Sequence, residues 1–152
     1  MYLERHWLEA VRLNPGHASA RRNLGILYLS SKRFAEAERE IQESLKIRRN
    51  HAGVVLLGDL LAETGHDREA IATYEESLQV APAHYRTWSV LAALYRKVGR
   101  HEDARRTFQQ GLELAEEALT ANPRDPECLS WCAFYHATMG AAPRARARAS
   151  EA

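Results

Sequence analysis

The residues best suited to chemistry in this chain are two cysteines and a histidine in its C-terminal quarter. Cys128, Cys132 and His136 are spaced four residues apart, so on a helix they form one stripe. Thiolate and imidazole groups are preferred zinc ligands, which makes a soft-metal site conceivable. Three ligands along one helix nevertheless span about 12 Å, too far for a single ion. The spacing therefore favours packing of this stripe against a neighbouring helix, and we expect no metal site.

No other pattern in the sequence indicates catalysis. The chain contains no glycine-rich phosphate loop, no HExxH zinc motif and no GxSxG nucleophile elbow. No histidine has an evident serine or cysteine partner in the sequence. Five of the seven histidines fall at predicted repeat boundaries or turns: His17, His51, His66, His84 and His101. We therefore expect no catalytic residue, no cofactor and no enzyme activity.

The composition narrows the setting of the protein. The chain has 152 residues and a net charge of +1, which argues against a polyanion as its main partner. Its apolar runs are far shorter than the roughly 18–20 residues that span a bilayer. The first residues contain no apolar secretory core, and two cysteines do not make a disulfide framework. These features indicate a reduced, cytoplasmic setting without membrane or nucleic-acid contact.

A spaced pattern of small and apolar residues recurs about every 34 residues. The small positions lie 33, 34 and 41 residues apart, and an alanine follows each of them twelve residues later. Apolar residues at spacings of three and four around these positions predict two amphipathic helices per repeat. A small residue lets two helices approach closely, so each pair is expected to pack as a hairpin. Helix breakers predict the turns of the first three hairpins at Lys32-Arg33, Gly65-His66-Asp67 and Val98-Gly99-Arg100. The two sets are Gly25, Gly58, Ala92 and Ala133, then Ala37, Ala70, Ala104 and Ala145.

These residues resemble the tetratricopeptide repeat (TPR) family, whose pattern is Trp, Leu, Gly and Tyr in a first helix and Ala, Phe or Tyr, and Ala in a second. The chain departs from that pattern at Arg21 and Arg49, where Trp and Pro would stand. The resemblance covers nearly the whole chain. It implies an all-α fold of antiparallel helix-turn-helix repeats stacked into a right-handed solenoid that binds other proteins. The residues that carry it are Trp88, Leu91, Ala92, Tyr95, Ala104 and Phe108, together with Leu57, Gly58, Ala70, Tyr74 and Pro82.

The repeat pattern predicts a single array in five parts. These are a lone second helix of a partial repeat (1–17), three repeats (18–50, 51–84 and 85–125) and a truncated fourth (126–152). The third repeat is 41 residues long, and we expect its second helix to be extended and to end before Asn122. In the fourth repeat, Gly140 is expected to stop the first helix near Met139. The segment from Pro143 to Ala152 is then predicted to form a second helix.

The first fifteen residues carry an apolar stripe made of Leu3, Trp7, Ala10 and Val11. This stripe belongs to a second helix whose first half is missing. Two interpretations are open: a natural capping helix, or a chain cut from a longer array. An exposed tryptophan-bearing face at an array end favours aggregation unless a neighbour covers it, so we prefer the second interpretation.

The TPR resemblance implies a concave face lined by the first helix of each repeat. First-helix positions that are not needed for packing are free to face this groove. The set combines apolar residues with arginines and an aspartate, so we expect a peptide or partner protein with apolar anchors and an acidic group. The oligomeric state stays open. The candidate partner-binding residues are Arg22, Ile26, Val55, Asp59, Arg86, Ser89, Arg96 and Phe134.

The sequence bears on three alternative functions. The first, a regulatory or substrate-docking TPR segment of a larger multidomain enzyme or signalling protein, stays open. The second is the carboxylate clamp of chaperone-binding TPR domains. That clamp needs a lysine and an asparagine where Arg22 and Ile26 stand. The third is base reading by pentatricopeptide-like arrays, which needs polar side chains where Ile26, Val55 and Ala93 stand.

Overall fold

The computed structural model describes the backbone of residues 2–150 and the side chains of residues 2–140. Within this range the chain forms eight α-helices and no strand, as the all-α prediction requires. The helices belong to two compact units, Met1–Val80 and Ala81–Ala152. No described helix is both long enough and apolar enough to cross a membrane. Whether the units join in one continuous array stays a prediction.

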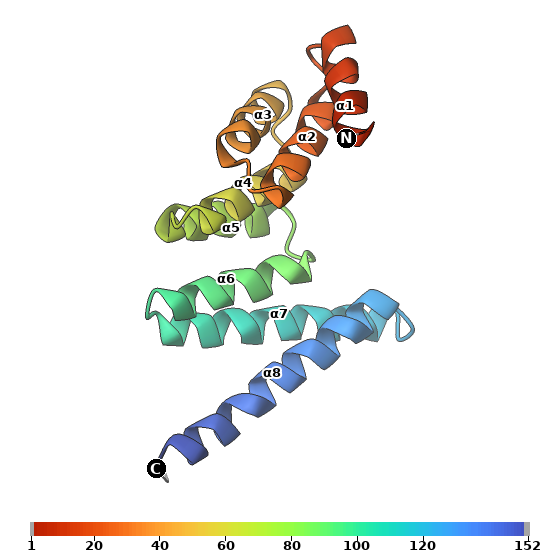
Figure 1. Cartoon of the computed structure of the whole chain (residues 1–152). Helices are drawn as coiled ribbons and strands as arrows, with labels where there is room; N and C mark the ends of the chain where they lie inside the picture. Colours follow the sequence, from red (N-terminus) through yellow and green to blue (C-terminus); the bar gives the residue numbers. More distant parts are fainter. Residues whose placement is uncertain (1, 151–152) are drawn as a thin grey trace. The chain divides into compact units, whose positions relative to one another are not determined.

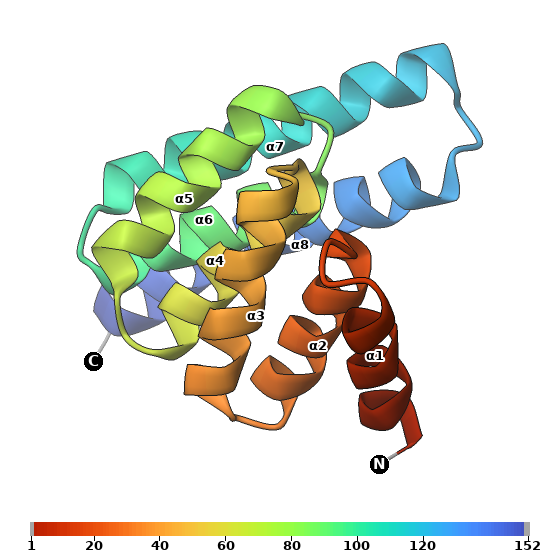
Figure 2. The ribbon, with the colours of Figure 1, turned by 90° about the horizontal axis from the view of Figure 1, so that it is seen from above.

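The first unit contains α1 to α5 (Figures 1 and 2). Each helix packs against the next one along the chain, and α2 also touches α4. The pairs α2/α3 and α4/α5 are antiparallel hairpins, and α1 packs on the side of α2 (Figure 2). The bounds are α1 Tyr2–Leu13, α2 Ala18–Ser30, α3 Phe34–Ile47, α4 His51–Glu63 and α5 Asp67–Val80.

The turn inside each hairpin has one residue in the left-handed region. That residue is Lys32 (φ 58°) in the first hairpin, Gly65 (φ 81°) in the second and Gly99 (φ 82°) in the third. In all three, the N–H of the following residue donates to the carbonyl oxygen five residues earlier, at 2.7–2.8 Å. This hydrogen bond closes the C-terminus of the first helix and turns the chain back. The predicted breakers are therefore the observed turns.

Glycines bring the helices of each hairpin in unit 1 into contact. A Cβ on Gly25 would lie 2.7 Å from Ile41 Cγ1, and one on Gly58 would lie 2.8 Å from Tyr74 Cε1. Neither position has room for a side chain, so the predicted role of these two glycines is confirmed. Around Gly25 the core is apolar and draws on α2, α3 and α4. Its buried members are Leu24, Tyr28, Ala37, Ile41, Leu56 and Leu60.

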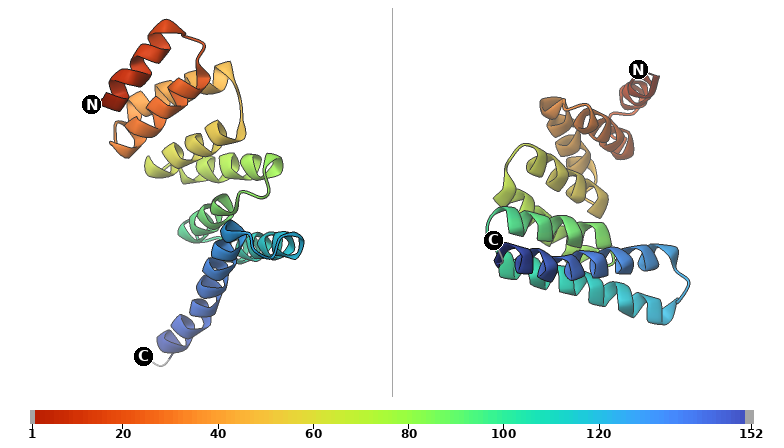
Figure 3. Two further views of the ribbon diagram at one scale, coloured as in Figure 1. Left: turned by 90° about the vertical axis from the view of Figure 1, so that its right-hand side faces the viewer. Right: turned by 60° about the horizontal axis from the view of Figure 1, so that its bottom comes forward.

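The second unit contains α6 Tyr85–Lys97, α7 His101–Ala121 and α8 Pro126–Ser150. Helix α7 packs against both α6 and α8, and α8 runs back from the end of α7 while diverging from it toward the C-terminus (Figure 3). The predicted extension of the third repeat is confirmed. Helix α7 has 21 residues and ends at Ala121, directly before Asn122 and Pro123.

The prediction for the fourth repeat is wrong in two respects. Helix α8 continues through Gly140 to Ser150, so no turn separates a first helix from a second one at Pro143. Glycine inside a helix costs only about 1 kcal/mol relative to alanine, and the alanine- and arginine-rich segment after it favours helix. The side chain of Ala145, one of the predicted small positions, lies outside the described residues.

The inward face of α8 is also shifted by one residue from the predicted register. Ala133 and His136 were expected to pack, but both are exposed. Cys132 is buried as expected, and Tyr135 is buried in place of His136. Tyr135 donates a hydrogen bond to the carbonyl oxygen of Tyr85 at 2.6 Å. It does so past Gly111, where a Cβ would lie 2.6 Å from the Tyr135 hydroxyl. The glycine of α7 therefore selects which side of α8 faces the core.

Candidate functional site

The predicted binding residues of unit 1 lie on two touching helices, α2 and α4. We call the surface formed by Arg22, Ile26, Val55 and Asp59 the α2–α4 face. The two helices meet where the Cβ position of Gly25 lies 3.4 Å from Leu56 Cδ2. Gly25 and Leu56 immediately adjoin Ile26 and Val55 in the sequence, so the structure brings the four predicted residues onto neighbouring elements.

The members of the α2–α4 face differ in how much surface they offer. Ile26 is 49% exposed, so about half of its aliphatic side chain is open to a ligand. Val55 is 7% exposed, so little of its side chain is available to a ligand. Asp59 is half-buried and accepts a hydrogen bond of 2.5 Å from the hydroxyl of Tyr74 on α5. The aspartate thus also helps to hold the α4/α5 hairpin together.

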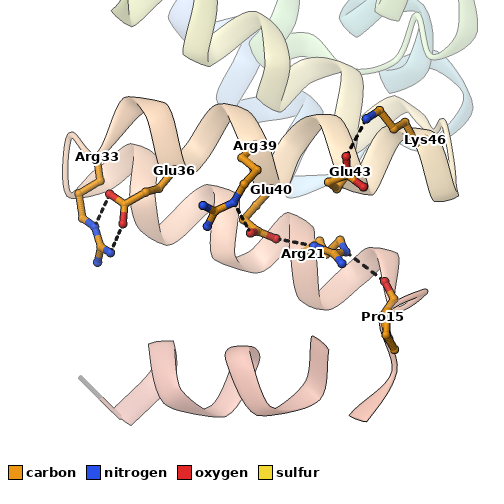
Figure 4. A network of polar contacts seen from close by, with 8 residues as sticks. All are labelled: Pro15, Arg21, Arg33, Glu36, Arg39, Glu40, Glu43 and Lys46. Carbon is orange, nitrogen blue, oxygen red and sulfur yellow. Dashed lines mark hydrogen bonds and ion pairs between the residues drawn. The ribbon is translucent and has the colours of Figure 1, made fainter. Parts of the chain in front are cut away.

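Arg22 is half-buried and one helical turn before Ile26. Among the described residues, no acidic side chain pairs with it. Its neighbour Arg21 differs, because its Nη1 lies 2.9 Å from Glu40 Oε2 and its Nε donates to the carbonyl oxygen of Pro15 (Figure 4). The helix therefore carries one arginine committed to the fold and one whose charge is not balanced by an ion pair.

The other four predicted residues belong to unit 2. Arg86 and Arg96 are exposed on α6, and Ser89 is half-buried with its hydroxyl donating to the carbonyl oxygen of Arg86 at 2.8 Å. Phe134 lies on α8 and is 44% exposed. These residues are in a different unit from the α2–α4 face. A common groove through both units stays a prediction.

The prediction missed an aromatic residue beside Phe134. Trp131 is half-buried on α8, and its ring meets Phe134 edge to face with centroids 5.4 Å apart. Leu129 on the same helix is exposed. The spacing of Trp131 and Phe134, three residues apart on a helix, was the available signal, but the register error described above placed Trp131 outside the groove positions.

The stripe of cysteines and histidine is divided between the core and the surface. Cys128 and Cys132 are buried, and the Cys128 thiol donates a weak hydrogen bond to the Tyr85 hydroxyl at 3.6 Å. Burial raises the pKa of Cys132, so its thiol stays protonated at neutral pH. His136 is exposed and meets Glu116 at 2.9 Å. No group of three His, Cys, Asp or Glu side chains within the described residues is arranged to hold a metal ion.

Comparison with known proteins gives consistent matches along the chain. Three family models, all described as tetratricopeptide repeat, match residues 4–52, 54–84 and 87–127. The chain is 26% identical over 115 residues to the BBSome complex member BBS4 of Bos taurus, covering 76% of this chain and 21% of that protein. It is also 26% identical over 110 residues to the tetratricopeptide repeat-containing protein trd-1 of Caenorhabditis elegans, covering 71% of this chain and 14% of that one. The chain thus spans about a fifth or less of each of these relatives.

Solved structures of MamA share the fold. A crystal structure of MamA superposes with a TM-score of 0.71 at 20% identity, over 78% of this chain and 66% of that one. Another MamA structure (MSR-1) gives a TM-score of 0.65 at 22% identity, over 76% of this chain and 67% of the other. Likeness at this level of identity establishes the arrangement of paired antiparallel helices and carries no information on ligands.

Proposed function

Because this chain belongs to the tetratricopeptide repeat family, we propose that it is a protein-interaction module that binds a peptide or partner protein on its first helices, and in unit 1 on the α2–α4 face. The proposed role makes and breaks no covalent bond. The chain instead presents a rigid helical surface whose side chains are held in place before the ligand arrives, which lowers the entropic cost of binding.

The observation that carries this proposal is the pairing of Arg22 with Ile26. An aliphatic side chain that is 49% exposed gains most when a ligand covers it. One turn away, Arg22 has no acidic partner among the described residues. An arginine in a partly buried setting binds a carboxylate more strongly than it would in open water, because the local dielectric is lower. Together the two residues suit a ligand with an apolar anchor beside an acidic group.

The relatives support a role in association. The first is named as a member of the BBSome complex, so its printed name places it in a protein assembly. By analogy, we infer that the repeats of this chain also serve assembly with other proteins. The acidic, apolar-anchored ligand is specific to this proposal and comes from the residues of the α2–α4 face.

The length of the relatives favours one alternative form of the same role. Both are several times longer than the matched segment. In a protein of that kind, the same face would be a docking segment for a regulator or substrate of other domains. The binding chemistry would be unchanged, and only the origin of the ligand would differ.

The experiment compares two face variants with two matched controls in the same unit. Arg22→Glu reverses the unpaired charge, and Ile26→Asp replaces the exposed anchor. Arg68→Glu and Ile47→Asp make the same changes at exposed positions of α5 and α3, away from the first helices. Proteins captured by the immobilised chain are quantified by mass spectrometry, and the affinity of the captured partner is then measured by calorimetry.

We expect Arg22→Glu and Ile26→Asp each to weaken the partner at least tenfold, and the two controls to stay within twofold. Circular dichroism must show unchanged helicity in all four variants. A partner that binds the face variants as tightly as the wild type contradicts the α2–α4 face. If Arg86→Glu on α6 weakens that partner instead, the binding site belongs to unit 2.

A further inference from the structure

One face of α1 corresponds to the faces of α3 and α5 that are buried in the two hairpins that follow. We call Leu3, Trp7 and Ala10 the α1 face. The repeat spacing aligns these residues with Ala37, Ile41 and Ser44 of α3, and with Ala70, Tyr74 and Ser77 of α5. In α3 and α5, all six aligned residues are buried, and none is more than 3% exposed.

In both of these hairpins the cover is the first helix. Helix α2 covers α3 through Gly25, which adjoins Ile41, and the Ser44 hydroxyl donates to the carbonyl oxygen of Ala18 at 2.9 Å. Helix α4 covers α5 at Gly58, where an added Cβ would lie 2.8 Å from Cε1 of the Tyr74 ring. The same contact therefore occurs in both hairpins: a bulky residue of the second helix packs against a glycine of the first.

On α1 the same positions are only partly covered. Helix α1 contains no buried residue, Leu3 is 57% exposed, and Trp7 and Ala10 are only half-buried. Tyr2 and Leu13, elsewhere on the same helix, are exposed as well. Among the described residues, no glycine-bearing helix contacts Trp7 in the way that α2 and α4 contact Ile41 and Tyr74.

Helix α1 is anchored along one edge of this face, so it is held in the place of a second helix. Trp7 and Val11 pack against the core cluster of α2, α3 and α4. Glu4 forms an ion pair of 2.9 Å with Arg33, at the turn between α2 and α3. Helix α1 packs against α2 as α3 packs against α4. The α1 face therefore corresponds to the surface that, in α3 and α5, contacts the first helix of the same hairpin.

We propose that the α1 face binds an amphipathic helix of first-helix type, with an apolar residue followed by glycine or alanine and a bulky apolar residue three positions later. The small residue sits on Trp7 as Gly58 sits on Tyr74. A larger residue would hold the two helices apart, because each Cβ position at the equivalent contacts is already closer than 3 Å to the opposing side chain. This surface is separate from the α2–α4 face and extends the proposed function.

The probe is a peptide with the sequence of α4, residues 51–63, with its ends capped and its helix held by a side-chain staple on the exposed side. Stapling is needed because an isolated helix of this length is marginal in water. The matched control peptide carries the Gly58→Leu change and is otherwise identical. Binding to the full chain is followed by NMR through the indole N–H signals of the three tryptophans, with Trp7 assigned from a Trp7→Phe variant.

A matched pair of protein variants locates the contact on α1. Leu3→Asp places a charge on the α1 face. Leu8→Asp makes the same change at an exposed position that aligns with exposed Gln42 and Glu75. We expect the α4 peptide to shift the Trp7 signal, and both Leu3→Asp and the Gly58→Leu peptide to weaken binding at least tenfold. Leu8→Asp should change the affinity less than twofold.

Equal binding of the two peptides would overturn the proposal, as would an unmoved Trp7 signal or the absence of binding at millimolar peptide. Sedimentation of the chain alone tests another occupant. A dimer that Leu3→Asp abolishes would assign the face to a second copy of the chain and would also overturn the proposal. Binding of a partner to the α2–α4 face can be measured in the same variants, so the two results are independent.

Discussion

Arg21 and Glu40 form an ion pair across the α2/α3 hairpin, 2.9 Å between Nη1 and Oε2, with side chains only 16% and 7% exposed (Figure 4). Arg21 stands where the family has tryptophan. It also donates to the carbonyl oxygen of Pro15, six residues earlier, and Trp88 of α6 donates in the same way to Pro82. The arginine thus replaces both the packing and the hydrogen bond of the tryptophan, and Glu40 neutralises the charge that this replacement introduces.

We expect Arg21→Ala to lower the free energy of unfolding by about 1–3 kcal/mol, because the Glu40 carboxylate stays buried and keeps only the exposed Arg39 as a partner. The double variant Arg21→Trp/Glu40→Leu should recover most of this loss, since replacing a buried ion pair by apolar residues is often neutral. Urea unfolding followed by circular dichroism measures both. A double variant less stable than Arg21→Ala would contradict the assigned equivalence of arginine and tryptophan.

The contact between Gly58 and Tyr74 predicts a steric effect at α4. Gly58→Ala places a Cβ within 3.0 Å of three atoms of the tyrosine ring, and should destabilise the protein by about 1–3 kcal/mol. Gly58→Leu should separate the hairpin more completely. The control is Gly140→Ala, also inside a helix, where no atom lies within 4 Å of the new Cβ. This control should be neutral or stabilising by up to about 1 kcal/mol.

Thermal and urea unfolding of the three glycine variants check this prediction. Equal stability of Gly58→Ala and the wild type would show that the tyrosine ring can move aside at no cost. The close packing of α4 on α5 would then not depend on the missing side chain.

Lys32 occupies the left-handed position that glycine takes in the next two turns, at φ 58°. A non-glycine residue there is strained, so Lys32→Gly should raise the free energy of unfolding by about 0.5–1 kcal/mol, after allowance for the greater freedom of glycine in the unfolded chain. The reciprocal change, Gly65→Lys, should lower it by a similar amount. A Lys32→Gly protein that is less stable than the wild type would mean that the lysine side chain stabilises the fold by more than the backbone strain costs.

Stability at high pH depends on the tyrosines of unit 2. Burial and the hydrogen bond with Cys128 raise the pKa of Tyr85 to about 12, and burial raises the pKa of Tyr135 as well. A raised pKa in the folded state means that the unfolded chain releases the proton first. The stabilising contribution is therefore complete below pH 10 and lost as the pH rises toward 12.

The measurement is the urea midpoint between pH 8 and pH 12, compared in the wild type and Tyr85→Phe. We expect the midpoint of the wild type to fall most steeply above pH 10, and that of Tyr85→Phe to fall less steeply. Parallel curves for the two proteins would show that Tyr85 titrates alike in the folded and unfolded states.

Features of the fold that depend on local pattern could be predicted from the residues alone. The spacing of Gly25 and Gly58 predicted where helices meet, because a missing side chain is visible in the sequence and its packing consequence is local to one hairpin. Gly65 and Gly99 predicted the turns, and the uninterrupted run after His101 predicted the long α7. Each of these follows from helix periodicity and backbone conformation without knowledge of distant contacts.

The buried side of α8 and the partner that neutralises Arg21 depend on contacts between helices and could not be predicted from the sequence. The sequence of α8 offers apolar residues on more than one side, and one residue of shift turns a helix by about 100°. The choice is made by Gly111 on α7, which leaves room for Tyr135 to reach the backbone of Tyr85. Likewise, Glu40 is nineteen residues from Arg21 in the sequence, and no local pattern marks it as the partner. Contacts between helices select among faces that each helix alone would allow, because the free energy of burial depends on what the neighbouring helix presents.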